Sequence, residues 1–196
     1  MRIIAGTLRS RRLKTVEGEG YRPAMGKVRE ALFSMLSARL GADFDGLRVL
    51  DLFAGSGSLA FEALSRGAAL AHLVELSPAA VRCLGENIDA LGLRERAFVV
   101  KEDVLKVVRR VRGTGRGMAP SYELVFLDPP YHHHLAQGSL DGLVECGWLS
   151  PGAYVVMEIE DRLAVDVPTA LTVEADRRFG QTRVLLMRLD EHTENA

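Results

Sequence analysis

The stretch VFLDPPYHHH, residues 125–134, places an acid, two prolines and an aromatic ring directly after an apolar run. Consecutive prolines fix φ and donate no backbone hydrogen bonds, so a central strand cannot continue through them. One interpretation is an ordinary turn that ends a strand. The other is a rigid clamp, in which Asp128, a proline carbonyl and Tyr131 face a flat polar ligand.

A second group of residues suited to ligand binding is the glycine-containing turn DLFAGSG, residues 51–57. Gly55 and Gly57 allow the backbone to turn tightly and to approach a ligand closely. The turn lacks the third glycine of the dinucleotide-binding fingerprint, because Ala60 stands at that position. Asp51 also places negative charge where a pyrophosphate would lie. The turn therefore favours a cationic or zwitterionic ligand.

Two further acids follow apolar runs and indicate which ligand this is. Glu75 ends the run AHLVE, within the offset of about 20 residues at which an acid reaches ribose hydroxyls. Asp103 follows AFVVK, where an aspartate either accepts from an adenine amino group or caps the next helix. S-adenosylmethionine (SAM) has the matching chemistry: adenine, ribose, an amino-acid tail and a sulfonium, without a phosphate. The predicted cofactor residues are Asp51, Phe53, Ala54, Gly55, Gly57, Glu75, Leu76, Asp103 and Val104.

The elements that must position these residues alternate from about residue 48 onward. Short apolar runs such as RVLDLF and YELVFLD are separated by helix-length segments, which is typical of a parallel sheet covered on both faces. Near the end, LTVEADRRF and TRVLLMRL flank Gly-Gln and predict an antiparallel hairpin. The expected fold is α/β and Rossmann-like, with a mostly parallel seven-stranded sheet, helices on both faces and a C-terminal antiparallel hairpin.

The first 40 residues stand outside this alternation. RIIAG and RRLKTV predict a small basic hairpin, and apolar residues at helical spacing after Pro23 predict a packing helix. The expected division is a basic arm over residues 1–22, a main domain over 23–190 with the packing helix at 23–40 and a core at 47–190, and a tail over 191–196.

Charge is unevenly distributed along the chain. The net charge is −1, yet residues 1–40 carry +6 and the remainder carries −7. A basic segment on an acidic body is typical of a protein that binds a polyanion locally, although a solvated charged surface has the same composition. The predicted phosphate contacts are Arg9, Arg11, Arg12 and Arg22.

The apolar runs and the cysteine spacing bear on the cellular compartment and on metal binding. No apolar run approaches the roughly 20 residues that a membrane helix needs. Cys83 and Cys146 lack the spacing of a disulfide framework or of a zinc site. We expect a cytoplasmic, monomeric protein without a metal ion.

DLFAGSG, Glu75 and DPPY together resemble class I methyltransferases that modify exocyclic amino groups. The resemblance implies that the Asp128 carboxylate and the Pro129 carbonyl accept hydrogen bonds from the amino group. Pro130 would keep this clamp rigid and Tyr131 would stack on the base, so the four residues are the predicted catalytic set.

The likeness extends over nearly the whole chain. RIIAG, Arg22-Pro23, VREALFSML, DLFAGSGSLAFEALSRGA and FGQTRVLLMR are similar to the RsmD-type family. The resemblance implies SAM-dependent methylation of N2 of a guanine in small-subunit (16S) ribosomal RNA, within the subunit or an assembly intermediate.

The chain departs from the family pattern at two places. Ala24-Met25-Gly26-Lys27 stands where the family carries Thr-Thr-Asp/Glu-Arg/Lys, which puts any contact of those side chains with cofactor or RNA in doubt. His132–His134 is also unusual, and we interpret it as a loop segment near the RNA.

Other functions fit part of the same pattern. DPPY does not separate a guanine-N2 enzyme from an adenine-N6 or cytosine-N4 nucleic-acid methyltransferase. A SAM-binding RNA or ribosome-assembly factor without catalysis is an alternative from a different class. A nicotinamide-dependent oxidoreductase is disfavoured by the missing third glycine and by DPPY.

Overall fold

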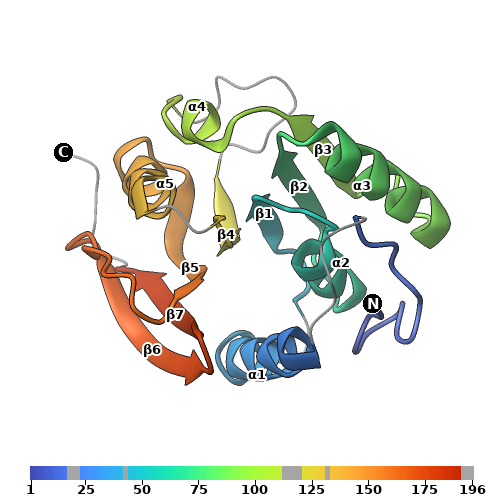
Figure 1. The fold of residues 1–196 in the computed structure, drawn as a ribbon, viewed down its shortest axis with the longest axis horizontal. Coiled ribbons are helices and arrows are strands. Elements are labelled where there is room, and N and C mark those ends of the chain that lie inside the picture. Colours follow the sequence, from blue (N-terminus) through green and yellow to red (C-terminus); the bar gives the residue numbers. More distant parts are fainter. Residues whose placement is uncertain (17–22, 42–43, 112–120, 131–132, 191–196) are drawn as a thin grey trace. The chain divides into compact units, whose positions relative to one another are not determined.

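A computed structural model describes residues 1–16, 23–41, 44–111, 121–130 and 133–190. The chain divides into two compact units, Met1–Lys101 and Glu102–Ala196. Each unit contains strands and helices of the predicted α/β pattern, coloured from blue to green in the first unit and from green to red in the second (Figure 1).

The described part of the first unit contains three parallel strands and three helices: α1 (Pro23–Leu40), β1 (Arg48–Leu52), α2 (Ser58–Ser65), β2 (Leu70–Glu75), α3 (Pro78–Leu91) and β3 (Ala97–Lys101). β2 lies between β1 and β3, with Leu73 paired to both Asp51 and Val99. Because the strands are parallel, their carboxyl ends meet at one edge of the sheet. This edge carries both predicted acids of the first unit.

Helix α1 occupies the range over which the sequence predicts a helix. It buries Leu32, Phe33 and Leu36, and the Phe33 ring stacks on the Phe44 ring with centroids 5.9 Å apart. Neither α1 nor any other helix of the described residues is long and apolar enough to cross a membrane.

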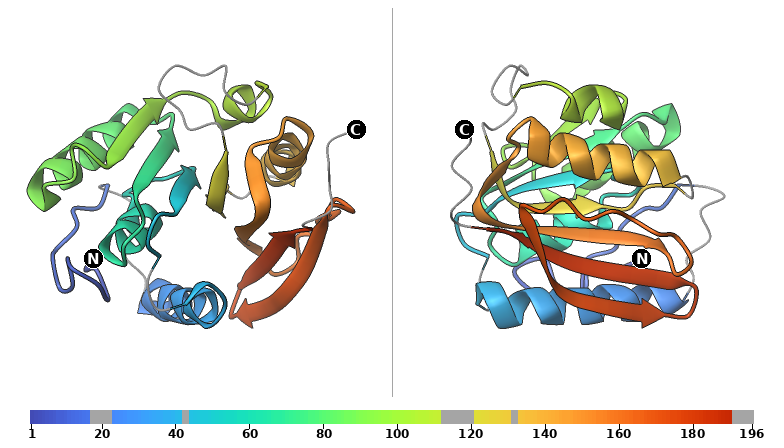
Figure 2. Two further views of the ribbon diagram at one scale, coloured as in Figure 1. Left: turned by 180° about the vertical axis from the view of Figure 1, so that it is seen from behind. Right: turned by 90° about the vertical axis from the view of Figure 1, so that its left-hand side faces the viewer.

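Residues 1–16, which we call the N-terminal arm, form a short hairpin. Arg2 and Arg12 make a single antiparallel bridge, and the Ile3 N–H donates to the Arg11 carbonyl at 3.1 Å. Two apolar side chains of the arm, Ile3 and Leu13, are buried. Figures 1 and 2 show the arm in dark blue beside α2 and α3.

The described part of the second unit contains α4 (Val104–Val108), β4 (Tyr122–Leu127), α5 (His133–Glu145), β5 (Leu149–Glu160), β6 (Leu171–Phe179) and β7 (Thr182–Leu189). β4 and β5 are parallel, whereas β7 is antiparallel to both β5 and β6. Pairing of Phe179 with Thr182 closes the hairpin around Gly-Gln, as the sequence predicts. The hairpin is the orange-red layer of Figure 2.

Helix α5 corrects the interpretation of His132–His134 as loop residues. His133 and His134 begin the helix, whereas His132 lies outside the described residues. Gly138 and Gly142 lower helix propensity, and they also allow α5 to approach α4 closely. A Cβ at Gly142 would lie 2.7 Å from a methyl group of Val108.

Candidate active site

The turn between β1 and α2 is tight and anchored to β2. The Ala54 N–H donates to the Val74 carbonyl at 3.1 Å, and the Gly57 N–H donates to the Ala54 carbonyl at 2.7 Å. Phe53 has a left-handed φ of 63°, beside Gly55 at 54° and Gly57 at 77°. A left-handed residue other than glycine costs roughly 1–2 kcal/mol. Strain of this kind is concentrated at ligand-binding sites.

Glu75 connects this turn to the end of β2. Its Oε2 accepts from the Gly55 N–H at 2.9 Å, and its Oε1 accepts from the N–H groups of Leu76 and Ser77 at 2.7 and 2.8 Å. A carboxylate has about four lone-pair sites, so Glu75 retains capacity to accept from a ligand hydroxyl. The Leu76 side chain is 58% exposed beside it and offers an apolar surface.

Asp51 lies beneath the turn and is almost completely buried. Its Oδ2 accepts from the Ala60 N–H at 3.2 Å. Burial raises the pKa of Asp51 to about 8, against the opposing effect of the Ala60 hydrogen bond, and the nearby Glu75 carboxylate adds a smaller increase. A cationic ligand near Asp51 would favour its charged form. The acids of the turn thus fit a sulfonium and an ammonium group better than a phosphate.

The pKa of Asp51 predicts a specific dependence of stability on pH. Between about pH 4 and pH 8 the folded chain holds a proton on Asp51 that the unfolded chain has released, so the free energy of unfolding falls as pH rises. Asp51→Asn removes this titration. Between pH 5 and pH 7, wild type should lose about 2–3 kcal/mol more unfolding free energy than the variant, from about 1.4 kcal/mol per pH unit. Urea unfolding at several pH values measures it, and parallel curves would contradict the assignment.

In the second unit, Asp128 directly follows β4, a strand with a buried end. Val125, Phe126 and Leu127 are buried, and the next residue, Asp128, is exposed. Pro129 is buried and fixes the chain behind it. Pro130 is exposed, and Tyr131 lies outside the described residues. The carboxylate is therefore presented at the end of a rigid strand.

Asp103 adopts the capping role that the sequence left open. Its side chain accepts from the Lys106 N–H at 3.0 Å and caps α4. Val104, the first residue of that helix, is buried. A role of either residue in cofactor binding stays a prediction.

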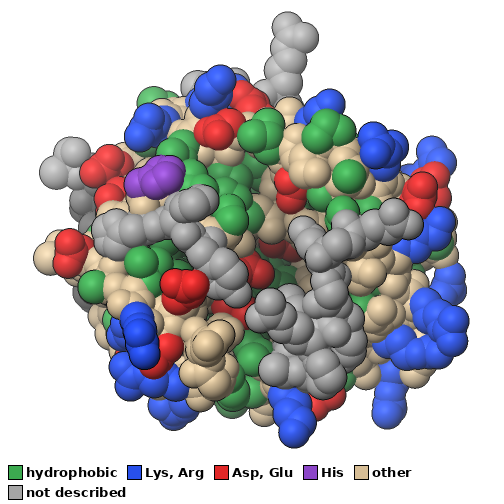
Figure 3. Space-filling model, in the orientation of Figure 1, with side chains coloured by type: hydrophobic (Ala, Val, Ile, Leu, Met, Phe, Trp, Pro, Cys, Tyr) green, Lys and Arg blue, Asp and Glu red, His purple; other side chains and the backbone are tan. Residues whose placement is uncertain are grey.

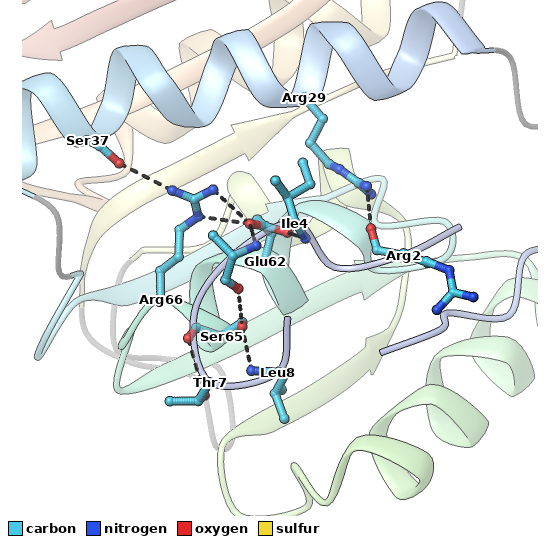
Figure 4. A network of polar contacts seen from close by, with 10 residues as sticks. Arg2, Ile4, Thr7, Leu8, Arg29, Ser37, Glu62, Ser65 and Arg66 are labelled. Atoms are coloured by element: carbon cyan, nitrogen blue, oxygen red, sulfur yellow. Dashed lines mark hydrogen bonds and ion pairs between the residues drawn. The ribbon is translucent and has the colours of Figure 1, made fainter. Parts of the chain in front are cut away.

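Sequence reasoning missed a polar network that holds the N-terminal arm on α2 (Figure 4). The fully buried Glu62 carboxylate accepts from the N–H groups of Ile4 and Ala5 at 2.7 and 3.0 Å. Arg66 forms an ion pair with Glu62 at 2.9 Å and donates to the Ser37 hydroxyl at 3.3 Å. The signal in the sequence was a glutamate inside the apolar helix SLAFEALS.

The arm presents arginines to solvent. Arg9, Arg11 and Arg12 are exposed, and Lys and Arg side chains gather at the right-hand edge of Figure 3, where the arm lies in Figure 1. Arg11 also donates to the Ala90 carbonyl of α3. Arg22 lies outside the described residues.

Comparison with known proteins gives the class of this chain. The solved structure described as "Putative methyltransferase yhhF from Escherichia coli" has a TM-score of 0.83 and 31% identity, and the match covers 97% of this chain and 98% of that one. A ribosomal protein L11 methylase from Lactobacillus delbrueckii, 17% identical, has a TM-score of 0.64 over 93% of this chain and 87% of that one, which concerns the fold alone. The predicted mostly parallel seven-stranded fold is confirmed. The chain is a class I methyltransferase.

The family is equally clear. A family model described as "Conserved hypothetical protein 95" matches residues 1–188. Ribosomal RNA small subunit methyltransferase D from Haemophilus influenzae is 35% identical over 181 residues, covering 92% of this chain and 89% of that protein. The protein of the same name from Escherichia coli is 33% identical over 197 residues, covering 100% and 93%. The chain belongs to this RsmD-type family.

Proposed function

We propose that this protein transfers a methyl group from SAM to the exocyclic N2 amino group of a guanine in 16S ribosomal RNA. The observation that carries the proposal is the exposed Asp128 carboxylate at the abrupt end of buried β4, followed by two prolines. The names of the relatives, ribosomal RNA small subunit methyltransferase D, support the substrate class.

SAM fits the chemistry of the residues around the β1–α2 turn. Glu75 would accept from the ribose hydroxyls, and the exposed Leu76 side chain would contact the adenine. The buried Asp51 would face the positively charged part of the cofactor. SAM supplies an electrophilic methyl group on a sulfonium. Phe53, Ala54, Gly55, Gly57, Asp103 and Val104 complete the proposed cofactor set.

The clamp would act by orienting the amino group. The nitrogen lone pair of guanine N2 is delocalised into the ring, which makes this nitrogen a poor nucleophile. The Asp128 carboxylate and the Pro129 carbonyl would each accept a hydrogen bond from one N–H of the amino group. These two bonds would direct the nitrogen lone pair toward the methyl group. Tyr131 would stack on the base, a common mode of RNA recognition. Asp128 is exposed, so it would pass the proton released during transfer to water.

The proposed substrate is 16S ribosomal RNA within the small subunit or an assembly intermediate. The arm arginines Arg9, Arg11 and Arg12, with Arg22, would contact its phosphates. We propose a monomer that acts in the cytoplasm.

Methyl transfer from labelled SAM to small ribosomal subunits that lack the modification tests this function, with nucleoside mass spectrometry of the product. Labelled N2-methylguanosine is the expected result. Labelled methyladenosine or methylcytidine would agree with an amino-group clamp at Asp128, but it would contradict guanine as the methylated base. SAM binding without transfer to subunits, naked RNA or DNA would favour a non-catalytic RNA-binding role.

Removing charge from the arm should weaken RNA binding and flatten its salt dependence. In Arg9→Ala/Arg12→Ala, we expect the slope of log K against log salt to become shallower by about 0.7–0.9 per lost phosphate contact. Arg94→Ala is the control, because Arg94 is also exposed but lies outside the arm and is paired with Asp89 on α3. RNA titrations at several salt concentrations measure the slope. Equal slopes in all three proteins would identify the arm as a solvated surface only.

A further inference from the structure

Asn87 is a polar residue on the buried face of α3. The other residues buried on this helix are Ala80, Leu84, Ile88 and Leu91, with Cys83. Asn87 occurs at the same helical spacing and is only 1% exposed. A buried amide must satisfy its hydrogen-bonding groups, because each unsatisfied group costs about 1–3 kcal/mol. Its partners therefore indicate what the residue holds in place.

The Asn87 amide contacts two segments that are far apart in the sequence. Its Oδ1 accepts from the Lys14 N–H at 2.8 Å, and its Nδ2 donates to the Lys14 carbonyl at 3.1 Å. These two bonds pair Asn87 with the arm as a neighbouring strand would. The same Nδ2 donates to the Ser56 carbonyl at 3.1 Å. Both amide hydrogens and the carbonyl oxygen are thus used.

Ser56 stands between the two glycines of the β1–α2 turn. On one side of it, the Gly55 N–H is held by Glu75, and on the other, Gly57 precedes α2. Lys14 belongs to the arm whose arginines face solvent. One buried side chain therefore connects the proposed RNA-binding arm to the proposed cofactor-binding turn.

We infer that Asn87 is a positioning residue that couples the arm to the turn, so that RNA and cofactor each strengthen binding of the other. The inference rests on the proposed function. A ligand that fixes either segment reduces the ordering cost of the second ligand, which produces positive coupling. Coupling is reciprocal and typically amounts to 5–150-fold in affinity.

Glu86 provides a matched control on the same helix. Its carboxylate forms an ion pair with the Lys14 ammonium group at 2.8 Å, and both side chains are more than half exposed. Glu86→Ala removes a contact with the same arm residue, and it leaves the Asn87–Ser56 bond intact. Asn87→Ala removes the contacts of the amide with both segments.

Affinity for S-adenosylhomocysteine, the cofactor without its transferable methyl group, tests the coupling without turnover. In wild type and Glu86→Ala, small ribosomal subunits lacking the modification should tighten its binding at least about fivefold. In Asn87→Ala the dissociation constants with and without subunits should agree within about twofold. An unchanged ratio in Asn87→Ala, or no tightening in wild type, would overturn the inference.

Hydrogen exchange separates failure of this inference from failure of the proposed function, because it needs no RNA. S-adenosylhomocysteine should slow amide exchange in residues 11–16 of wild type and Glu86→Ala, and it should not do so in Asn87→Ala. Equal protection in all three proteins would overturn the coupling. Absence of methyl transfer by wild type, with this pattern of exchange intact, would instead overturn the RNA substrate.

Discussion

Asp128→Ala is expected to lower kcat for methyl transfer by about 10²–10³-fold, the usual cost of removing one preorganised polar contact from a reaction centre. The loss follows from orientation, since the amino nitrogen would lose one of the two acceptors that direct its lone pair. The variant should still fold, because Asp128 is exposed and truncating it leaves no cavity in the core. Steady-state methylation of small ribosomal subunits at saturating SAM, together with a thermal melt, measures kcat and stability.

Two further variants define the cause of this loss. Asp128→Asn retains a carbonyl oxygen as acceptor, so its kcat should lie between those of wild type and the alanine variant. Asp141→Ala removes another carboxylate of the second unit, one that accepts from the Gln137 amide at 2.8 Å, and it should leave kcat unchanged. If Asp128→Ala retains wild-type kcat, the DPPY segment is only a turn that ends β4.

The strands could be predicted from the sequence because each is a continuous apolar run, which local composition reveals. The start of β5 is harder to predict from the sequence. Pro151 and Gly152 suggest a break, yet the strand begins at Leu149. The pairing of β4 with β5 shifts register between Tyr122 and Leu124, so an irregularity accommodates the proline within the ladder.

Helix α5 could not be predicted from the sequence, because residues unfavourable for a helix are accommodated there by tertiary packing. Its sequence contains Gly138 and Gly142, each unfavourable in an isolated helix by about 1 kcal/mol. The advantage that offsets this cost is close packing against Leu105 and Val108 of α4, where a Cβ would lie 3.1 and 2.7 Å away. Such an advantage depends on the tertiary structure and leaves no local signal.

The candidate site likewise contains residues with a local signal in the sequence and residues whose contacts depend on the tertiary structure. The places of Asp51, Glu75 and Asp128 at the ends of strands could be predicted, because each acid closes or follows an apolar run, whereas their roles stay predictions. The positions of Glu62 and Asn87 on buried helix faces are visible in the sequence, but their partners are not. These partners lie 57 to 58 and 73 residues away in the arm, so only the fold shows what they hold.

The second large effect is expected from Gly57→Ala, which should destabilise the protein by about 2–5 kcal/mol. Gly57 has a φ of 77°, which costs an alanine roughly 1–2 kcal/mol. An added Cβ would also lie 2.4 Å from Phe61 and 2.7 Å from Leu84, and overpacking of this kind costs typically 1–3 kcal/mol. The turn must shift to relieve these contacts, so SAM affinity should fall together with stability. Thermal unfolding and SAM titration measure the two effects.

Gly92→Ala separates backbone strain from overpacking. Gly92 ends α3 with a φ of 71°, nearly that of Gly57, and a Cβ there would meet nothing within 4 Å. Its substitution should lower the free energy of unfolding only by the strain of a left-handed alanine, roughly 1–2 kcal/mol, and SAM affinity should be unchanged. The difference between the two variants then reports the close packing of Phe61 and Leu84 beneath the turn. Equal losses in both would mean that α2 and α3 move apart readily, and that the turn is not held rigidly by the helices on which it rests.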